Sequence, residues 1–185
     1  MIIIKHRVNS IKEINHKFGI EIDIHNYNNE LVLAHDHPNE QCIKLDDFIT
    51  HVPKNSLVAI NIKNEGVEAG LKTILSRSKT TNYFTFDWPV TSLDSAISHD
   101  LNCAFRLSEY EKDIIPKCPW VWLDSFNEIW YDSDFLLSLK KSGIKLAIVS
   151  PELHNREEDI NKVKDIVNAV KVDAICTDIP ESWST

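Results

Sequence analysis

A chain of 185 residues with a formal net charge of −8 at pH 7 is long enough to bury one sizeable core, so we expect a single domain over residues 1–185. The acidic balance argues against a nucleic-acid partner, because no basic stripe is present to neutralise a phosphate backbone. No apolar run reaches the roughly 18 residues that cross a bilayer, and the MIII start is too short for a secretory signal. Four cysteines without a C-x-x-C pair are typical of free thiols in a reducing cytosol, so we expect a soluble cytoplasmic protein.

The first predicted strand is MIIIK, and it ends directly in His6 and Arg7. The Ser10-x-x-Glu13 sequence that follows has the residue types of a capping box, which predicts a short helix before the chain returns to the sheet. The pattern indicates a small β-α-β unit with a histidine and an arginine at the end of its first strand.

The second predicted strand, IEIDI, projects two carboxylates into one space. In an extended strand Glu21 and Asp23 share one face, while the isoleucines take the other. Two such acids repel each other unless a cation lies between them. A polar Asn-Asn turn then returns the chain through LVLA and delivers His35 at the end of that segment. An edge hairpin with a solvated acidic face is the alternative interpretation of these residues.

Helix-like and strand-like patterns alternate through the rest of the chain. Apolar residues at helical spacing predict helices over 45–52, 67–75, 91–97, 135–143 and 155–170. Thr91 and Asn155 have the residue types of helix N-caps, so we expect them to begin two of these helices. Pro116 is expected in a loop.

Counting the strand-like runs gives eight strands, separated mostly by helical segments: IIIK, IEIDI, LVAINI, YFTFD, CAFRL, WVWLD, KLAIVS and AICTD. This alternation implies parallel crossovers, and eight strands imply closure into a (β/α)₈ TIM barrel, an α/β fold. Because such barrels usually need roughly 200 to 400 residues, the barrel must be compact, with shortened or missing helices. An open doubly wound sheet is the alternative, but the chain has only four glycines and no glycine-rich phosphate loop.

Active groups of such barrels lie at the carboxyl ends of the strands. Besides the residues above, those ends carry Asn61, Lys63, Asp87, Arg106, Asp124 and Asp178. Each acid among them has an ordinary alternative as a helix cap or a surface residue, and Arg106 would then simply pair with one of them. We expect solvent exposure for His25, His37, His51 and His154, and core positions for Trp120 and Trp122.

A strand ending in His-Arg, a helix, a strand with Glu-x-Asp and a return segment ending in His-Asp together resemble the glycerophosphodiester phosphodiesterase family. Residues 57–63, LVAINIK, look like the third strand of that family, and residues 172–180, VDAICTDIP, look like its closing strand. The phosphatidylinositol-specific phospholipases C share its fold and its two-histidine chemistry. The resemblance implies a TIM barrel of the phospholipase C-like phosphodiesterase type, with a role in lipid metabolism.

The resemblance also implies a metal-dependent phosphodiester hydrolase with two histidines as acid and base. His6 and His35 would transfer the protons, while Arg7 and Lys63 would balance the charge of the phosphate. Oxygen ligands favour Mg²⁺ or Ca²⁺, with Mn²⁺ as a further candidate. The expected ligands are Glu21, Asp23 and Asn61, with Asp124 and Glu65 as supplementary candidates. The substrate is expected to be a small or polymeric phosphodiester that contacts Arg106 and Asp87.

Two departures from the family pattern keep alternatives open. The residue after His-Arg is usually glycine but is Val8 here, and the third acidic ligand of the family is replaced by Asn61, a weaker oxygen donor. One alternative is a metal-free lyase that stops at a cyclic phosphate, which the two carboxylates argue against. The other is a barrel that binds a phosphorylated ligand without turnover, which the two histidines argue against.

Overall fold

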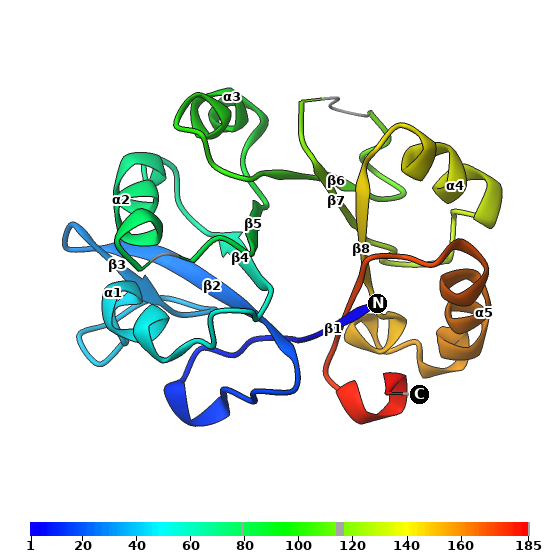
Figure 1. The fold of residues 1–185 in the computed structure, drawn as a ribbon, viewed down its shortest axis with the longest axis horizontal. Helices are drawn as coiled ribbons and strands as arrows, with labels where there is room; N and C mark the ends of the chain where they lie inside the picture. The colour runs from blue at the N-terminus through cyan, green and yellow to red at the C-terminus, as the bar shows by residue number, and fades with distance from the viewer. Residues whose placement is uncertain (79, 114–116, 185) are drawn as a thin grey trace.

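The computed structural model describes residues 1–78, 80–113 and 117–184, in which one sheet is surrounded by short helices (Figure 1). The strands are β1 Ile2–Lys5, β2 Gly19–Tyr27, β3 Glu30–Leu33, β4 Val58–Ile62, β5 Tyr83–Phe86, β6 Ala104–Leu107, β7 Trp120–Leu123, β8 Lys145–Val149 and β9 Ala174–Thr177. The α-helices are α1 Leu45–Phe48, α2 Glu68–Ser78, α3 Val90–Ser98, α4 Ser133–Lys141 and α5 Ile160–Val170. The 3₁₀ turns are η1 Ile11–Glu13, η2 Ile49–His51, η3 Pro151–His154, η4 Glu157–Asp159 and η5 Pro180–Trp183.

Eight parallel strands close into a barrel. Around the ring they follow the order β1, β2, β4, β5, β6, β7, β8, β9, and β9 pairs with β1. The ring closes between β5 and β6 through a single bridge from Thr85 to Cys103, where the Thr85 N–H also donates to the Asn102 carbonyl at 2.8 Å. β3 lies outside the ring and pairs with β2 in the antiparallel sense. The predicted TIM barrel is confirmed, and so is the hairpin that carries His35.

Alternation along the strands divides the apolar side chains between two packing regions. One region fills the inside of the barrel with large side chains, among them Ile4, Phe84, Phe86, Trp120 and Trp122. The other lies between the sheet and the surrounding helices and includes the three isoleucines of β2. The two acids of β2 therefore point into the barrel, as the period of two predicts.

The helical layer is thin, as the chain length predicts. Between β1 and β2 the only helical element is η1, where the Ser10 N–H donates to the Glu13 carboxylate at 3.1 Å in the predicted capping box. Between β6 and β7 the described residues contain no helix.

Two predicted helix starts are wrong. α3 begins at Val90, directly after Pro89, so Thr91 lies inside the first turn and does not cap it. Asn155 has a φ of +56° and ends η3, and α5 begins only at Ile160. An N-cap needs an extended backbone, whereas asparagine is also one of the few residue types that tolerate the left-handed conformation, so the residue type alone did not decide the position.

The predicted loop residue Pro116 lies outside the described part of the chain. Among the described residues, none of the helices has the length and apolar character that crossing a bilayer requires.

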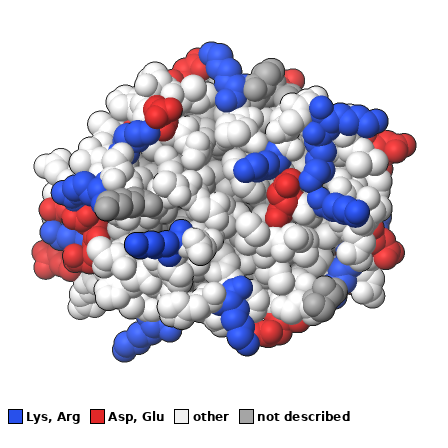
Figure 2. Space-filling model, in the orientation of Figure 1, with Lys and Arg blue, Asp and Glu red and all other residues white. Residues whose placement is uncertain are grey.

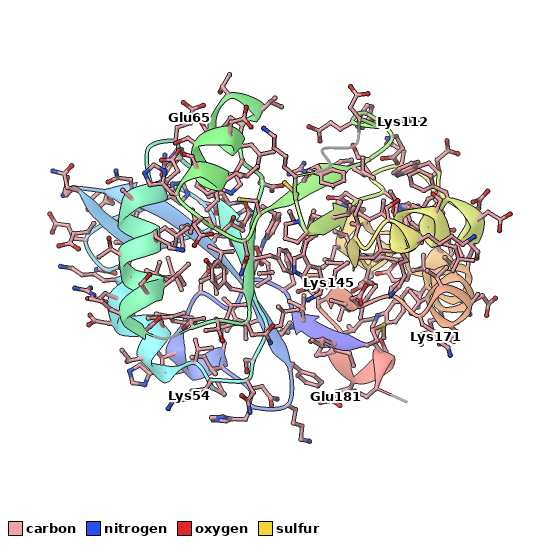
Figure 3. The ribbon with its side chains drawn as sticks, turned by 45° about the horizontal axis from the view of Figure 1, so that its top comes forward. Lys54, Glu65, Lys112, Lys145, Lys171 and Glu181 are labelled. Atoms are coloured by element: carbon pink, nitrogen blue, oxygen red, sulfur yellow. The ribbon has the colours of Figure 1, made fainter. Side chains whose placement is uncertain are left out.

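Figure 2 shows lysine and arginine dispersed among acidic side chains on the face that Figure 1 views, without a continuous stripe. Figure 3 separates the two ends of the barrel: Glu65 and Lys112, which follow β4 and β6, lie at the upper edge, and Lys54, which precedes β4, lies at the lower edge.

Candidate active site

A cavity of about 200 Å³ lies at the carboxyl ends of the barrel strands. One side, which we call the near wall, consists of the polar residues at the ends of β1 to β4: His6, Arg7, Glu21, Asp23, His35, Asn61 and Lys63. The opposite side, the far wall, consists of polar residues in or directly after β5 to β8: Asp87, Arg106, Asp124 and His154. A larger cavity of about 930 Å³ lies at the other end of the barrel, but no residue predicted for the site lines it.

His6 lies just after β1, and a carboxylate holds one of its ring nitrogens. Its Nδ1 is 3.1 Å from Oδ1 of Asp178, which follows the neighbouring strand β9. A carboxylate only accepts, so Nδ1 carries the proton and Nε2 is the nitrogen left for a ligand. Burial lowers the pKa of His6, with Asp178 acting in the opposite direction, so the neutral ring is favoured. Neutral imidazole with a free Nε2 is the form that accepts a proton.

His35, just beyond β3, contacts an acceptor on one side and a donor on the other. Its Nδ1 is 2.8 Å from Oδ1 of Asp36, and its Nε2 is 2.6 Å from Nη2 of Arg7. Because a guanidinium only donates, Nε2 must accept, and His35 is the neutral tautomer with its proton on Nδ1. Arg7 therefore occupies the free lone pair of this histidine until its guanidinium moves to another acceptor.

Glu21 and Asp23 are the most deeply buried charged groups of the near wall, each only 1% exposed. Oε2 of Glu21 accepts the backbone N–H of Arg7 at 2.8 Å, where the φ of Arg7 is +52°. This left-handed conformation costs a residue other than glycine about 1 to 3 kcal/mol. Burial, and then the charge of Asp23, raise the pKa of Glu21 to about 8. The carboxyl of Glu21 thus keeps its proton at neutral pH unless positive charge arrives beside it.

Asp23 is held by polar groups on both of its oxygens. Nζ of Lys63 is 2.9 Å from Oδ1, and the side-chain amide of Asn9 donates to Oδ2 at 2.9 Å. Asn61 is the register partner of Asp23 in β4, and its Oδ1 is buried without a hydrogen-bond partner in the described part of the chain. Leaving a buried acceptor unpaired costs about 1 to 3 kcal/mol, so this oxygen is available to a ligand's donor or to a cation.

The near wall offers three oxygen donors to a divalent cation. Glu21, Asp23 and Asn61 come from the adjacent strands β2 and β4, and hard cations prefer oxygen ligands. In the described ranges no three His, Cys, Asp or Glu side chains are grouped as a metal site, so the set depends on the amide oxygen. Lys63 already balances one negative charge of Asp23, which lowers the attraction for a cation. The donor set fits a hard divalent cation, bound with modest affinity.

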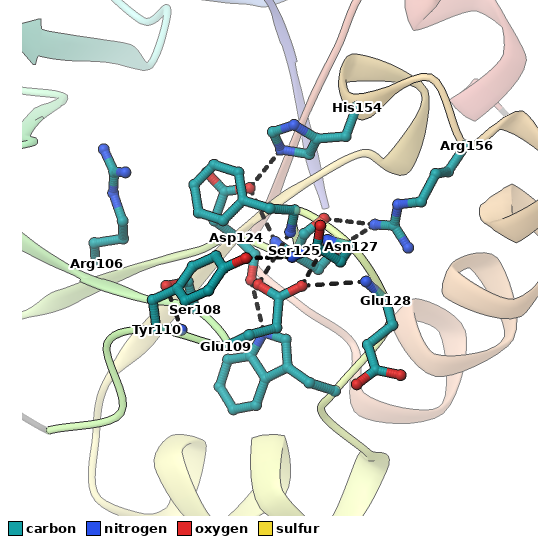
Figure 4. Close-up of polar contacts among 12 residues, drawn as sticks. Arg106, Ser108, Glu109, Tyr110, Asp124, Ser125, Asn127, Glu128, His154 and Arg156 are labelled. Atoms are coloured by element: carbon teal, nitrogen blue, oxygen red, sulfur yellow. Dashed lines mark hydrogen bonds and ion pairs between the residues drawn. The ribbon is translucent and has the colours of Figure 1, made fainter.

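The charged groups of the far wall are joined in closed pairs. Nε of Arg106 donates to Oδ1 of Asp87 at 3.0 Å, and Nη2 contacts the same carboxylate. Nε2 of His154 is 2.6 Å from Oδ1 of Asp124, as Figure 4 shows. The expectation that His154 faces solvent is therefore wrong, since its side chain is 22% exposed and lines the cavity. It lies on η3, five residues beyond the end of β8, so a search limited to strand ends misses it.

The structure brings all of the predicted site residues to the cavity except Glu65. Glu65 is exposed at the edge of the molecule and does not line the cavity, so we exclude it as a ligand (Figure 3). Asp124 lines the cavity on the wall opposite Glu21 and Asp23, but its Oδ1 is taken by His154 and by the Ser125 N–H at 2.9 Å. Sequence reasoning also missed Asn9, whose only signal is its place directly after the His-Arg-Val segment.

No model of a protein family matches the sequence, and no curated protein matches it. Solved structures are similar over nearly the whole chain. A glycerophosphodiester phosphodiesterase from Thermotoga maritima has a TM-score of 0.71 at 16% identity, covering 98% of this chain and 96% of that one. One from Agrobacterium tumefaciens has a TM-score of 0.71 at 12% identity, with coverages of 100% and 99%. A tryptophan synthase α-subunit from Pyrococcus furiosus has a TM-score of 0.57 at 13% identity, with coverages of 95% and 86%. At these identities the likeness establishes the fold, and it confirms at that level the resemblance seen in the motifs.

Proposed function

We propose that this protein is a phosphodiester hydrolase of the glycerophosphodiester phosphodiesterase type that uses a divalent cation. The observation that carries the proposal is the near wall, where two histidines with carboxylate partners, two buried acids and two cationic side chains line one cavity. Cleavage of a phosphodiester needs a base, an acid and positive charge at the phosphoryl oxygens, and the near wall has a residue for each. The similar structures from T. maritima and A. tumefaciens bear this enzyme name, which supports the proposal.

The proton transfers at the near wall belong to the two histidines. His6 presents Nε2 as a base, which takes the proton of the attacking hydroxyl as its oxygen bonds to phosphorus. His35 takes part once Arg7 has turned from its Nε2 to the phosphate. In the enzymes that the motifs resemble, a neighbouring hydroxyl of the substrate attacks first and water then opens the cyclic phosphate.

Cationic side chains and a bound metal ion at the near wall would both attract the phosphate. Arg7 and Lys63 are the cationic side chains there, and a guanidinium can bind two phosphoryl oxygens at once. Glu21, Asp23 and Asn61 would hold a Mg²⁺, Ca²⁺ or Mn²⁺ ion. Such an ion supplies Lewis acidity toward a phosphoryl oxygen and makes a nearby hydroxyl more acidic. The raised pKa of Glu21 supports this assignment, because an adjacent cation would stabilise the ionised carboxylate.

The size of the cavity bears on the substrate. About 200 Å³ is below the roughly 300 to 1,000 Å³ of pockets that enclose drug-sized ligands. The cavity therefore has room for a phosphoryl group with a small alcohol, and the remainder of a larger diester would extend through the open mouth. This is compatible with either a small or a polymeric phosphodiester.

One contact favours a second candidate function, the metal-free lyase. Nζ of Lys63 lies 2.9 Å from Oδ1 of Asp23, where it places a fixed positive charge beside the carboxylates. With Glu21 protonated and Asp23 paired with Lys63, the two carboxyls carry no unbalanced negative charge even without a metal ion, and Arg7 adds one positive charge. Such a site would close the cyclic phosphate on electrostatics alone.

The experiment that separates the two functions is turnover of an aryl phosphodiester of glycerol, whose neighbouring hydroxyl can attack the phosphorus, with and without a chelator. We expect activity to vanish when the protein is treated with the chelator and to return with Mg²⁺, Ca²⁺ or Mn²⁺. Full activity in the chelator, with a cyclic phosphate as the final product, would establish the lyase instead. Lack of turnover under every condition would leave the ligand-binding barrel.

A further inference from the structure

Glu152, on the η3 turn after β8, has a carboxylate on which three donors converge at the end of β9. Its Oε1 accepts the hydroxyl of Thr177 and the backbone N–H of Asp178, the latter at 3.2 Å. Its Oε2 accepts the hydroxyl of Ser150. Glu152 does not line the cavity of the candidate active site, so its contacts are with the protein and not with a substrate. Two of these contacts are with the residues that hold His6.

Asp178 lies just beyond the sheet, where strand pairing no longer fixes the backbone. The ladder between β8 and β9 ends at Cys176, and the pairing of β9 with β1 ends at Thr177. The side chain of Asp178 is 54% exposed, so burial does not fix it either. Two side chains hold its backbone instead: Glu152 accepts its N–H, and Nζ of Lys5 donates to its carbonyl at 2.7 Å.

The tautomer of His6 depends on this aspartate. Nδ1 of His6 is 3.1 Å from Oδ1 of Asp178, and the backbone N–H of His6 donates to the Thr177 carbonyl at 3.0 Å. A carboxylate that accepts from Nδ1 selects the tautomer with a bare Nε2, which is the form that a base needs. When such an acceptor moves away, the ring proton can shift to Nε2, and that nitrogen then accepts no proton.

The η3 turn that carries Glu152 is itself held on both sides. After Glu152, Nε2 of His154 is 2.6 Å from Oδ1 of Asp124, which ties the turn to the end of β7. Before Glu152, the Ser150 N–H donates to the Cys176 carbonyl of β9 at 2.9 Å. A group that positions another must have a fixed position of its own, and these contacts provide it.

We propose that Glu152 is a positioning residue of the candidate active site. By holding the backbone N–H of Asp178, it fixes the acceptor that keeps the ring proton of His6 on Nδ1. Both proton transfers of the proposed function stay with His6 and His35. The expected effect on turnover rests on the proposed function, whereas the expected effect on the tautomer of His6 does not.

The ring nitrogens of His6 test this inference directly. Long-range ¹H–¹⁵N correlation spectra distinguish a protonated ring nitrogen from a bare one, and the signal lost in His6→Gln assigns the ring. At about pH 8 the lowered pKa of His6 leaves the ring neutral, and we expect the wild-type proton on Nδ1. Glu152→Ala should shift much of the population to the tautomer with the proton on Nε2. It should also lower kcat for an aryl phosphodiester of glycerol by about 10- to 10²-fold, with little change in KM.

Two further variants separate positioning from a general loss of structure. Glu152→Gln keeps an oxygen that can accept from Thr177 and Asp178, so it should keep the wild-type tautomer and most of the turnover. Glu152→Asp, one methylene shorter, should shift the tautomer in the same direction as Glu152→Ala and replaces it should that variant not fold. A glutamine variant as damaged as the alanine variant would overturn the inference.

A double variant tests whether Glu152 acts through Asp178. In an Asp178→Ala background, Glu152→Ala should lower kcat hardly further, because the residue through which it acts is already gone. Losses that multiply in the double variant would mean that Glu152 acts by another route and would overturn the inference.

Glu109→Ala is the matched control, because the carboxylate of Glu109 also accepts three hydrogen bonds. Its donors are the N–H groups of residues 126 to 128, at 3.0, 2.8 and 3.1 Å (Figure 4). That loop follows β7, whereas the described hydrogen bonds of His6 run to Thr177 and Asp178. We therefore expect the His6 tautomer to be unchanged in Glu109→Ala.

An equal tautomer shift in Glu109→Ala would indicate general loosening and overturn the inference, as would an unchanged tautomer in Glu152→Ala. A wild-type protein with the Nδ1 tautomer but without turnover would contradict the proposed function, while the comparison of tautomers would still decide the role of Glu152.

Discussion

The near wall and the far wall of the cavity satisfy their polar groups in different ways. On the far wall, Arg106 pairs with Asp87 and His154 pairs with Asp124, so the charges are matched within the protein. On the near wall burial, and then the charge of Asp23, raise the pKa of Glu21 to about 8, and the amide oxygen of Asn61 has no described partner.

This difference indicates where ligand binding gains free energy by pairing buried polar groups. Buried polar groups in a folded protein are normally paired, and each exception costs free energy that a ligand can recover. On the near wall, two neighbouring carboxyls and one amide oxygen carry this unfavourable free energy. On the far wall, the polar groups are paired in fixed positions. We therefore expect the near wall to bind the charged centre of the substrate and the far wall to orient what is attached to it.

The largest expected effect comes from removing the near-wall base. His6→Ala should lower kcat for an aryl phosphodiester by about 10² to 10⁴, the usual contribution of a positioned proton-transfer group. Substrate affinity should change little, because the charge that meets the phosphate remains. Steady-state kinetics at several substrate concentrations would separate the two constants.

Asp178→Asn is the matched control for that change, since it keeps the ring of His6 but weakens its partner. Removing the carboxylate also removes the influence that raises the pKa of His6, so the acidic limb of the rate profile should move to lower pH. Near-normal turnover in His6→Ala would show that the near wall is not the catalytic side.

A smaller effect should follow from adding charge to the near wall. Asn61→Glu adds one negative charge beside Asp23, its register partner in β2. We expect Mn²⁺ to bind about tenfold more tightly, equivalent to about 1.4 kcal/mol, as measured by titration calorimetry. Asn61→Gln, which lengthens the side chain without adding charge, is the control. Unchanged affinity in the glutamate variant would mean that this side chain does not reach the cation.

The stability of the metal-free protein should also depend on pH. Glu21 ionises near 4.5 when unfolded and near 8 when folded, so between these values only the folded chain holds the proton. Stability should therefore be fully present below about pH 4.5 and fall as the pH rises toward 8, by at most about 1.4 kcal/mol per pH unit.

Denaturant unfolding in a chelator at several pH values would measure this dependence. Glu21→Gln should flatten it, because the amide mimics the protonated carboxyl and does not titrate. A variant as pH-dependent as the wild type would assign the effect to another group.

The sequence predicts the near wall better than the far wall for a physical reason. His6, Glu21, Asp23 and His35 fall within 36 residues and sit at positions that strand periodicity and strand ends determine. The strands themselves follow from apolar runs that must be buried on both faces. Local patterns therefore predict both the barrel and half of its site.

The far wall depends on contacts between residues that are distant in the sequence. His154 reaches Asp124 across 30 positions, and it does so from a 3₁₀ turn that periodicity does not indicate. Asn155, predicted as a helix start, instead adopts the left-handed conformation that ends this turn. The pairing of Lys63 with Asp23 is likewise a tertiary contact that residue types alone leave open.

We expect the near wall to bind a cation and a phosphate together. A crystal structure with Mn²⁺ and inorganic phosphate, using the anomalous signal of manganese, tests it most directly. We predict one metal peak within about 2.0 to 2.6 Å of oxygens from Glu21, Asp23 and Asn61. The guanidinium of Arg7 should have moved from His35 to the phosphate. A cavity without a metal peak, with Lys63 still paired to Asp23 and Arg7 still on His35, would contradict the claim.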